Sequence, residues 1–209
     1  MSKLLIVGAG GHGRVVAETA LQTRRWSEVA FLDDNGDIKP FLDIPVIGRL
    51  KDCELYRNEY RHVFVAFGDN QLRLKWLVHL EKAGFILPTI IHPWSFISSV
   101  CEIDVGSIVM AGAVIQANTN IGKGCIINTS SSVDHDCILE DGVHISPGVA
   151  IGGTVTIKKY TWIGIGSSVM NNVNIGSKAI VAAGATVIHD VADCVMVAGV
   201  PAKYMKALE

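Results

Sequence analysis

Large aliphatic side chains recur at every sixth position through the second half of the chain, from Ile91 to Val187. From Ile97 onward a small or β-branched residue stands two positions before each of them, and residues two apart in a strand point to the same side. Each hexad therefore sends one large and one small side chain inward before the chain turns. This period is typical of a parallel β-helix with a common core, whereas an α-helix needs spacings of three and four. The seventeen aliphatic positions are Ile91, Ile97, Ile103, Val109, Ile115, Ile121, Ile127, Val133, Leu139, Ile145, Ile151, Ile157, Ile163, Val169, Ile175, Val181 and Val187.

A different pattern occupies the first part of the chain, where short apolar runs alternate with helical stretches and predict a small parallel sheet. Pro88 and Pro93 bracket the start of the hexad frame, so we expect an α/β domain over residues 1–88 and a β-helix over residues 89–209. The frame fails at Asp193, which predicts an irregular C-terminal tail. The expected strands are 3–7, 29–32 and 62–67, and the expected helices are 14–25 and 71–83.

A glycine loop follows the first predicted strand. Gly8-x-Gly10-x-x-Gly13, with an acidic residue about twenty positions later, matches the dinucleotide fingerprint. By itself this motif indicates only a site for phosphate groups, because glycines let the backbone approach a phosphate and a helix N-terminus supplies free N–H groups. We expect a nucleotide diphosphate here; NAD, which needs a second mononucleotide half, and a purely structural turn are the alternatives.

Composition narrows the remaining possibilities. The net charge of −2 and the pI near 6.4 argue against a nucleic-acid partner or an anionic membrane surface, and no apolar run reaches the length of a membrane span. We therefore expect a cytoplasmic protein. Three of the five cysteines fill the small inward position and are expected to be packing residues. The chain has no Cys-x-x-Cys pair, and no metal site is expected.

One histidine stands out among seven. His135 follows the inward Val133 by two positions, which predicts an outward-facing corner of the coil, and it is flanked by Asp134 and Asp136. A carboxylate on an imidazole fixes its tautomer and raises its basicity, as a general base requires. An exposed corner with incidental acids is the alternative, and the sequence leaves open which aspartate is the partner.

The segment from Asn128 to Cys137, the hexad array, the Gly-Ala-Gly-Gly-His-Gly start and the Gly-Val-Pro-Ala-Lys ending together resemble the sugar acetyltransferases of the left-handed β-helix superfamily. The branch resembled most is that of the UDP-4-amino-sugar N-acetyltransferases of bacillosamine synthesis and the sialic acid O-acetyltransferases. The resemblance implies a left-handed coil, a homotrimer, and acetyl-CoA bound between adjacent subunits.

The resemblance also implies roles for single residues. His135 matches the general base and Asp136 the acid, often Glu, that raises its basicity. Three positions match contacts with acetyl-CoA, and six match the nucleotide-sugar pocket. The acetyl-CoA positions are His144, Ile165 and Ala183, and the nucleotide-sugar positions are Gly10, Gly11, His12, Asp33, Asp34 and Gly68.

Spacing adds an independent expectation. His144 lies nine positions after His135, which is half of a coil made of three hexads, so the two face different sides of the prism and share a site only across two subunits. Together with the roles that the resemblance implies, this leads us to expect an acetyl-CoA-dependent N-acetyltransferase that acts on a UDP-linked 4-amino-4,6-dideoxy sugar without a metal. The alternatives are a sugar O-acetyltransferase, a non-catalytic nucleotide-binding β-helix protein, and GDP or CMP in place of UDP.

Overall fold

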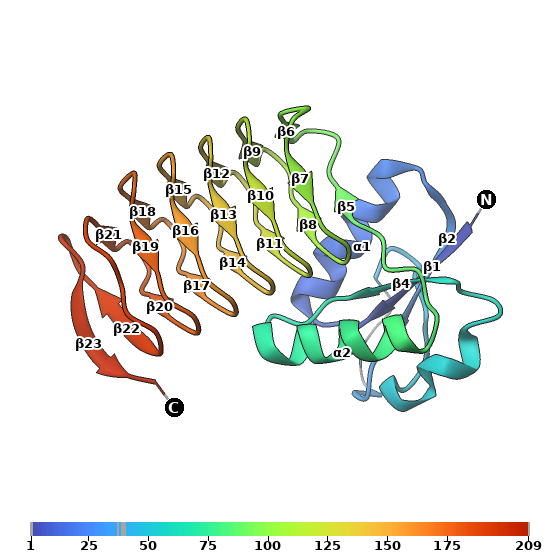
Figure 1. Ribbon diagram of the computed structural model, residues 1–209. Coiled ribbons are helices and arrows are strands. Elements are labelled where there is room, and N and C mark those ends of the chain that lie inside the picture. The colour runs from blue at the N-terminus through green and yellow to red at the C-terminus, as the bar shows by residue number, and fades with distance from the viewer. Residues whose placement is uncertain (1, 37, 39–40, 209) are drawn as a thin grey trace. The chain divides into compact units, whose positions relative to one another are not determined.

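The structure, a computed structural model, describes residues 2–36, 38 and 41–208. The chain divides into two compact units, residues 1–93 and 94–209. The first is an α/β unit and the second is a parallel β-helix (Figure 1). None of the described helices is both long and apolar enough to span a bilayer.

The α/β unit is built on a four-stranded parallel sheet in the order β3-β2-β1-β4. The inner residues Leu4–Val7 of β1 are fully buried, as expected of a parallel strand covered on both faces. The elements of this unit are β1 (Ser2–Val7), α1 (Gly11–Thr23), β2 (Trp26–Leu32), β3 (Val46–Gly48), the 3₁₀ helix η1 (Leu50–Tyr56), β4 (His62–Val65), α2 (Asn70–Lys82) and β5 (Ile90–Ile91).

The predicted elements of this unit are present, with shifted ends. Helix α1 begins three positions before the predicted start, so the last part of the glycine loop forms its first turn. Helix α2 begins after Asp69, whose carboxylate accepts the Leu72 N–H at 2.7 Å as an N-cap. The short elements β3 and η1 were not predicted, because neither carries a periodic apolar pattern long enough to distinguish it from a loop.

The second unit is a three-sided parallel β-helix, and we name each face after one strand (Figure 1). The β12 face holds β6 (Phe96–Ile97), β9 (Val114–Ile115), β12 (Ser132–Val133), β15 (Ala150–Ile151), β18 (Ser168–Val169) and β21 (Thr186–Val187). The β13 face holds β7 (Glu102–Ile103), β10 (Asn120–Ile121), β13 (Ile138–Leu139), β16 (Thr156–Ile157) and β19 (Asn174–Ile175). The β14 face includes β8 (Ile108–Val109), β11 (Ile126–Ile127), β14 (His144–Ile145), β17 (Trp162–Ile163), β20 (Ile180–Val181), β22 (Val195–Ala198) and β23 (Lys203–Ala207).

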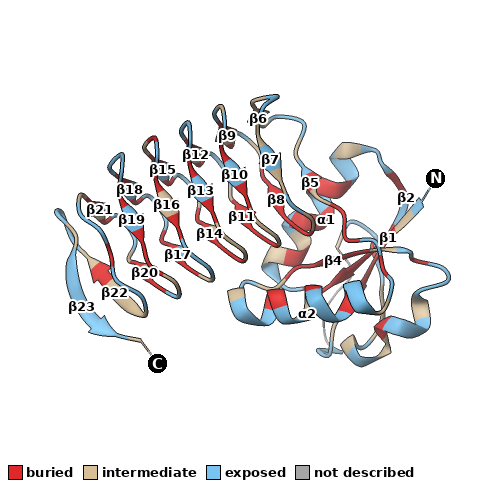
Figure 2. Cartoon of the chain, viewed as in Figure 1, coloured by how far each residue is buried: buried red, intermediate tan, exposed pale blue. Residues whose placement is uncertain are grey.

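The coil length follows from the strand register. Ile138 pairs with Asn120 and with Thr156, so each coil takes three hexads, as the sequence predicts. The predicted aliphatic positions from Val109 to Val187 are buried, and the small positions between them fill the same core (Figure 2). Ile91 departs from the pattern, since its side chain is 40% exposed and it lies in the first unit.

The final coil is shorter than the others. Val191 pairs with Ile175 and Met196 pairs with Ile180, and both pairs are two positions closer in sequence than a full coil. The corner after Val187 is therefore shortened, which explains why the hexad frame fails at Asp193, although Val191 and Val197 still enter the core. Strand β23 then turns back antiparallel to β22, and its side chains are exposed along its length (Figure 2).

From Gly106 onward, each corner of the full-length coils contains one residue with a positive φ. At two corners, between Gly106 and Gly184, glycine fills seven of these ten positions, because glycine alone adopts this conformation without strain. Those positions are Gly106, Gly124, Gly142, Tyr160 and Lys178 between the β13 and β14 faces, and Gly112, Ser130, Gly148, Gly166 and Gly184 between the β14 and β12 faces. At the third corner, which carries His135, the positions are Asn118, Asp136, Thr154 and Asn172.

Candidate active site

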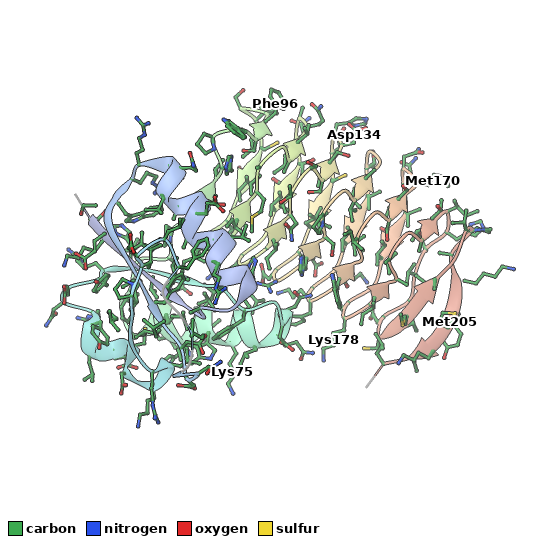
Figure 3. All side chains as sticks on the ribbon, turned by 180° about the vertical axis from the view of Figure 1, so that it is seen from behind. Lys75, Phe96, Asp134, Met170, Lys178 and Met205 are labelled. Atoms are coloured by element: carbon green, nitrogen blue, oxygen red, sulfur yellow. The ribbon has the colours of Figure 1, made fainter. Side chains whose placement is uncertain are left out.

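His135 projects from the corner between β12 and β13 and forms a close pair with Asp136. Its Nδ1 lies 2.7 Å from Asp136 Oδ2, and both side chains are about half exposed. This contact assigns the proton of a neutral imidazole to Nδ1, which leaves the lone pair of Nε2 free to accept a proton. Figure 3 places the neighbouring Asp134 on the edge of the prism that also carries Met170. The corner therefore presents a basic nitrogen at the surface.

The two flanking aspartates have different tasks. Asp134 Oδ1 accepts the backbone N–H of His135 at 2.9 Å and so fixes the turn, whereas Asp136 contacts the ring. The hydrogen bond with Asp136 raises the pKa of His135, and the charge of Asp134 adds to the effect. The same bond lowers the pKa of Asp136, so this carboxylate stays ionised. The geometry thus selects Asp136 as the partner of the imidazole.

Two residues that the sequence reasoning missed complete this corner. Asn118, one coil before Asp136, donates from Nδ2 to Asp136 Oδ1 at 3.2 Å. Gly153, one coil after His135, lies beside the ring, and a Cβ built there would be 2.7 Å from Cε1 and Nε2 of His135. Asn118 stands one full coil before Asp136, and Gly153 stands one full coil after His135. Counting one coil length in each direction from the His135–Asp136 pair would therefore have identified both residues from the sequence.

A second feature lies on the β14 face, where an apolar cavity of about 510 Å³ opens to solvent. His144, Ile165 and Ala183, the three predicted acetyl-CoA contacts, all line it. The His144 ring stacks on Trp162, with ring centroids 5.9 Å apart and planes inclined by 17°. An apolar cavity with a flat aromatic wall suits the pantetheine arm of coenzyme A.

Hydrogen bonds hold the wall of this cavity in place. Trp162 Nε1 donates to Ser146 Oγ at 2.7 Å, and Asn128 Nδ2 lies 3.5 Å from His144 Nε2. Trp162 was missed at the sequence level, although it stands one full coil after His144 and therefore pairs with it on the same face. His135 is not among the residues that line the cavity. The His135 corner and the cavity therefore lie on different sides of the β-helix.

The glycine loop of the α/β unit has the three parts of a phosphate cradle. Gly8 has φ +104°, which favours glycine, and a Cβ at Gly13 would lie 2.0 Å from the Gly8 carbonyl oxygen. A Cβ at Gly10 or Gly11 would meet nothing within 4 Å. The first glycine makes the turn, the last lets helix and strand pack, and the middle ones leave the backbone open to a ligand at the N-terminus of α1.

The other predicted substrate residues surround this cradle at the carboxyl ends of β2 and β4. Asp33 accepts the backbone N–H groups of Ala9 and Asn35 at 2.8 and 2.9 Å, and Asp34 accepts that of Leu50 at 3.1 Å. Both carboxylates thus hold loops in place. Gly68 leaves open space where its Cβ would be.

Beside the glycine loop, Arg73 supplies a positive charge and His12 a neutral imidazole. Burial, and then the charge of Arg73, lower the pKa of His12 to about 4, so the imidazole is neutral at pH 7. His12 Nε2 is sealed from solvent and has no hydrogen-bond partner within the described part of the chain. Arg73 is fully buried and donates to the carbonyls of Phe67 and Gly68 at 2.9 and 3.3 Å. The positive charge of Arg73 and the N–H groups at the N-terminus of α1 suit an anionic ligand.

Among the residues that the structure describes, no three His, Cys, Asp or Glu side chains gather as metal ligands would.

Known proteins are similar to this chain both in sequence and in fold. Residues 3–80 match the family of the PglD N-terminal domain. Over 174 residues the chain is 30% identical to GDP-perosamine N-acetyltransferase from Escherichia coli O157:H7, a match that covers 80% of this chain and 78% of that protein.

Two solved structures are similar over nearly their whole lengths. The acetyltransferase domain of PglB from Neisseria gonorrhoeae FA1090, in complex with acetyl coenzyme A, is 40% identical with a TM-score of 0.92, covering 97% of this chain and 98% of that one. A mutant of perosamine N-acetyltransferase from Caulobacter crescentus, in complex with CoA and GDP-perosamine, is 36% identical with a TM-score of 0.94, covering 99% and 98%.

Proposed function

The chain belongs to the hexapeptide-repeat sugar acetyltransferase family, and from this premise we propose that His135 is the general base for acetyl transfer to a UDP-linked 4-amino-4,6-dideoxy sugar. The protein is an acetyl-CoA-dependent N-acetyltransferase of nucleotide-linked amino sugars. The observation that carries the role of His135 is its geometry, because Asp136 engages Nδ1 and leaves the Nε2 lone pair free at the surface.

The proposed step is direct transfer. The sugar amine attacks the thioester carbonyl of acetyl-CoA, and His135 Nε2 takes the proton that the amine loses. The tetrahedral intermediate collapses with loss of the CoA thiolate, which leaves the acetamido sugar. Because a thioester is already activated, the reaction needs no nucleophilic side chain and no acyl-enzyme. Asp136 stabilises the imidazolium while His135 holds the proton.

We propose that the active protein is a homotrimer in which the cavity of one subunit faces the His135 corner of the next. The support is that His144, Ile165 and Ala183 line a cavity to which His135 does not contribute. A thioester carbonyl must come within about 3.5 Å of the amine that His135 deprotonates. A second copy supplies the missing half of the site, and rotational symmetry closes the ring.

The α/β unit is the proposed holder of the nucleotide diphosphate. Gly10 and Gly11 leave the N-terminus of α1 open, and the positive charge of Arg73 acts on the neutral His12. The resemblance to the bacillosamine enzymes supports uridine as the base. The similarity to GDP-perosamine N-acetyltransferases makes GDP the competing outcome.

The test is a CoA-release assay in which free thiol is measured for 4-amino-4,6-dideoxy sugars linked to UDP, GDP, dTDP and CMP, with a 4-hydroxy sugar nucleotide as control. We expect the highest kcat/KM with a UDP-linked amine, and His135→Ala should lower kcat by about 10²–10⁴. Preference for GDP would overturn the nucleotide assignment, and preference for the hydroxyl acceptor would overturn N-transfer. A His135→Ala enzyme within threefold of the parent at saturating substrates would show that His135 is not the base.

A further inference from the structure

The corner that carries His135 keeps side chains at its positive-φ positions, where the other two corners favour glycine. Asn118 has φ +59° and Asp136 has φ +58°, a conformation that costs free energy for any residue with a Cβ. Asparagine and aspartate tolerate it best among such residues. What distinguishes Asn118 and Asp136 from the other residues of this corner is the contact between their side chains, which glycine could not make.

The two side chains are joined to each other along the prism. Asn118 Nδ2 donates to Oδ1 of Asp136 at 3.2 Å, and Oδ2 of the same carboxylate lies 2.7 Å from His135 Nδ1. The oxygens of Asp136 thus have separate partners, one in the preceding coil and one in its own. A carboxylate held at both oxygens cannot rotate without breaking one of these bonds.

This arrangement matters because the corner is open. Asp136 is about half exposed, so an unheld carboxylate would exchange the imidazole for water. The amide of Asn118 also favours the ionised form and helps to lower the pKa of Asp136. The charged groups that act on His135 are Asp134 and Asp136 of its own corner, while the adjacent coils contribute the uncharged Asn118 and Gly153.

We propose that Asn118 is a positioning residue for acetyl transfer, which orients the Asp136 carboxylate toward His135. The inference rests on the proposed role of His135 as the base. Asn118 reaches the substrate only through this relay, so its loss should change kcat and the pH profile, with the KM values for sugar nucleotide and acetyl-CoA unaffected.

Two substitutions of Asn118 test the relay with opposite signs. Asn118→Gly keeps the left-handed turn and removes the donor. Asp136 then loosens from the ring, the pKa of His135 falls, and the acidic limb of the kcat profile moves to lower pH. Asn118→Asp places a second negative charge beside the pair, which raises the pKa of His135 and moves the limb to higher pH. We expect each kcat at its optimum to fall about 3–30-fold.

The matched control is Asn172→Gly, because Asn172 occupies the same turn position two coils beyond Asp136 with φ +62°. Its kcat and acidic limb should equal those of the parent, and the thermal midpoints of both glycine variants should agree. The inference would be overturned if the pH profile of Asn118→Gly coincided with that of Asn172→Gly. It would also be overturned if the acidic limb shifted in the same direction in Asn118→Gly and Asn118→Asp. His135→Ala, assayed in parallel, separates the claim that His135 is the base from the claim that Asn118 positions Asp136. If His135→Ala is inactive while Asn118→Gly matches the parent, His135 remains the base and only the positioning role of Asn118 is refuted.

Discussion

The close contact between Gly153 and His135 gives the sharpest test of the proposed role of His135 as the base. A Cβ at position 153 would lie 2.7 Å from Cε1 and Nε2 of the imidazole and 3.2 Å from Cδ2. Ordinary carbon contacts are about 3.5–4.0 Å, so Gly153→Ala must drive the ring back by about 1 Å. The ring is 56% exposed and can swing into solvent, but it then leaves Asp136.

The expected size follows from the geometry of proton transfer. A displacement of about 1 Å in a catalytic group costs about 10²-fold in rate, so we expect kcat to fall about 10–100-fold. Separation from Asp136 removes the contact that raises the pKa of His135, and the acidic limb should therefore move to lower pH. The backbone at Gly153 has no positive φ, so alanine fits there without strain and the thermal midpoint should stay within about 3 °C of the parent.

The neighbouring glycine provides the contrast. A Cβ at Gly152 would lie 2.8 Å from the backbone nitrogen of Asn171, which cannot swing away, so Gly152→Ala should destabilise the fold by about 1–3 kcal/mol. CoA-release kinetics across pH and thermal unfolding are measured for both variants. A Gly153→Ala enzyme with parental kcat and parental acidic limb would refute the claim that the imidazole must occupy its observed position.

Four further results are expected. Asp136→Asn should lower kcat less than His135→Ala does and move the acidic limb to lower pH; an unmoved limb would count against the pair. Light scattering should give roughly 67 kDa, three chains of 22.4 kDa, and an active monomer would contradict the shared site. Gly11→Val should raise KM for the sugar nucleotide and leave KM for acetyl-CoA nearly unchanged, while calorimetry should detect no micromolar NAD binding. The pKa of His12 is lowered from 6.5 to about 4, so the unfolded chain binds the extra proton between these values and stability falls as the pH drops from 6.5 to 4. His12→Asn should reduce that loss by at most about 3 kcal/mol, and identical acid unfolding curves would contradict the assignment.

The β-helix was predictable because the six-residue repeat of aliphatic positions in the sequence coincides with the positions that are buried in the structure. Each inward position repeats at every sixth place, so Val133 and Ile145 are assigned to the core from spacing alone. The shortened last coil was not predictable, since a deletion near Val187 shifts the frame and only the pairing of Val191 with Ile175 shows where it resumes.

The candidate site was predictable in its residue types and only partly in its contacts. His135 flanked by two acids suggested a base, but both aspartates are adjacent in sequence, and the left-handed turn at Asp136 decides which carboxylate reaches the ring. Arg73 gave no sequence signal, because an arginine in a helix is usually exposed and this one is fully buried. Its burial depends on the carbonyls of Phe67 and Gly68, a tertiary contact.

The constant coil of three hexads has a consequence for how such a gene can change in length. A tandem duplication of one coil ahead of Asn118 would extend the prism and keep every inward side chain in register. The same duplication between Asn118 and Asp136 would preserve the fold equally well, yet it would insert a foreign rung, about 4.8 Å thick, between the amide and the carboxylate. An added coil is therefore compatible with the packing of the prism at either place, but only a coil outside the three rungs from Asn118 to Gly153 leaves the contacts of His135 intact.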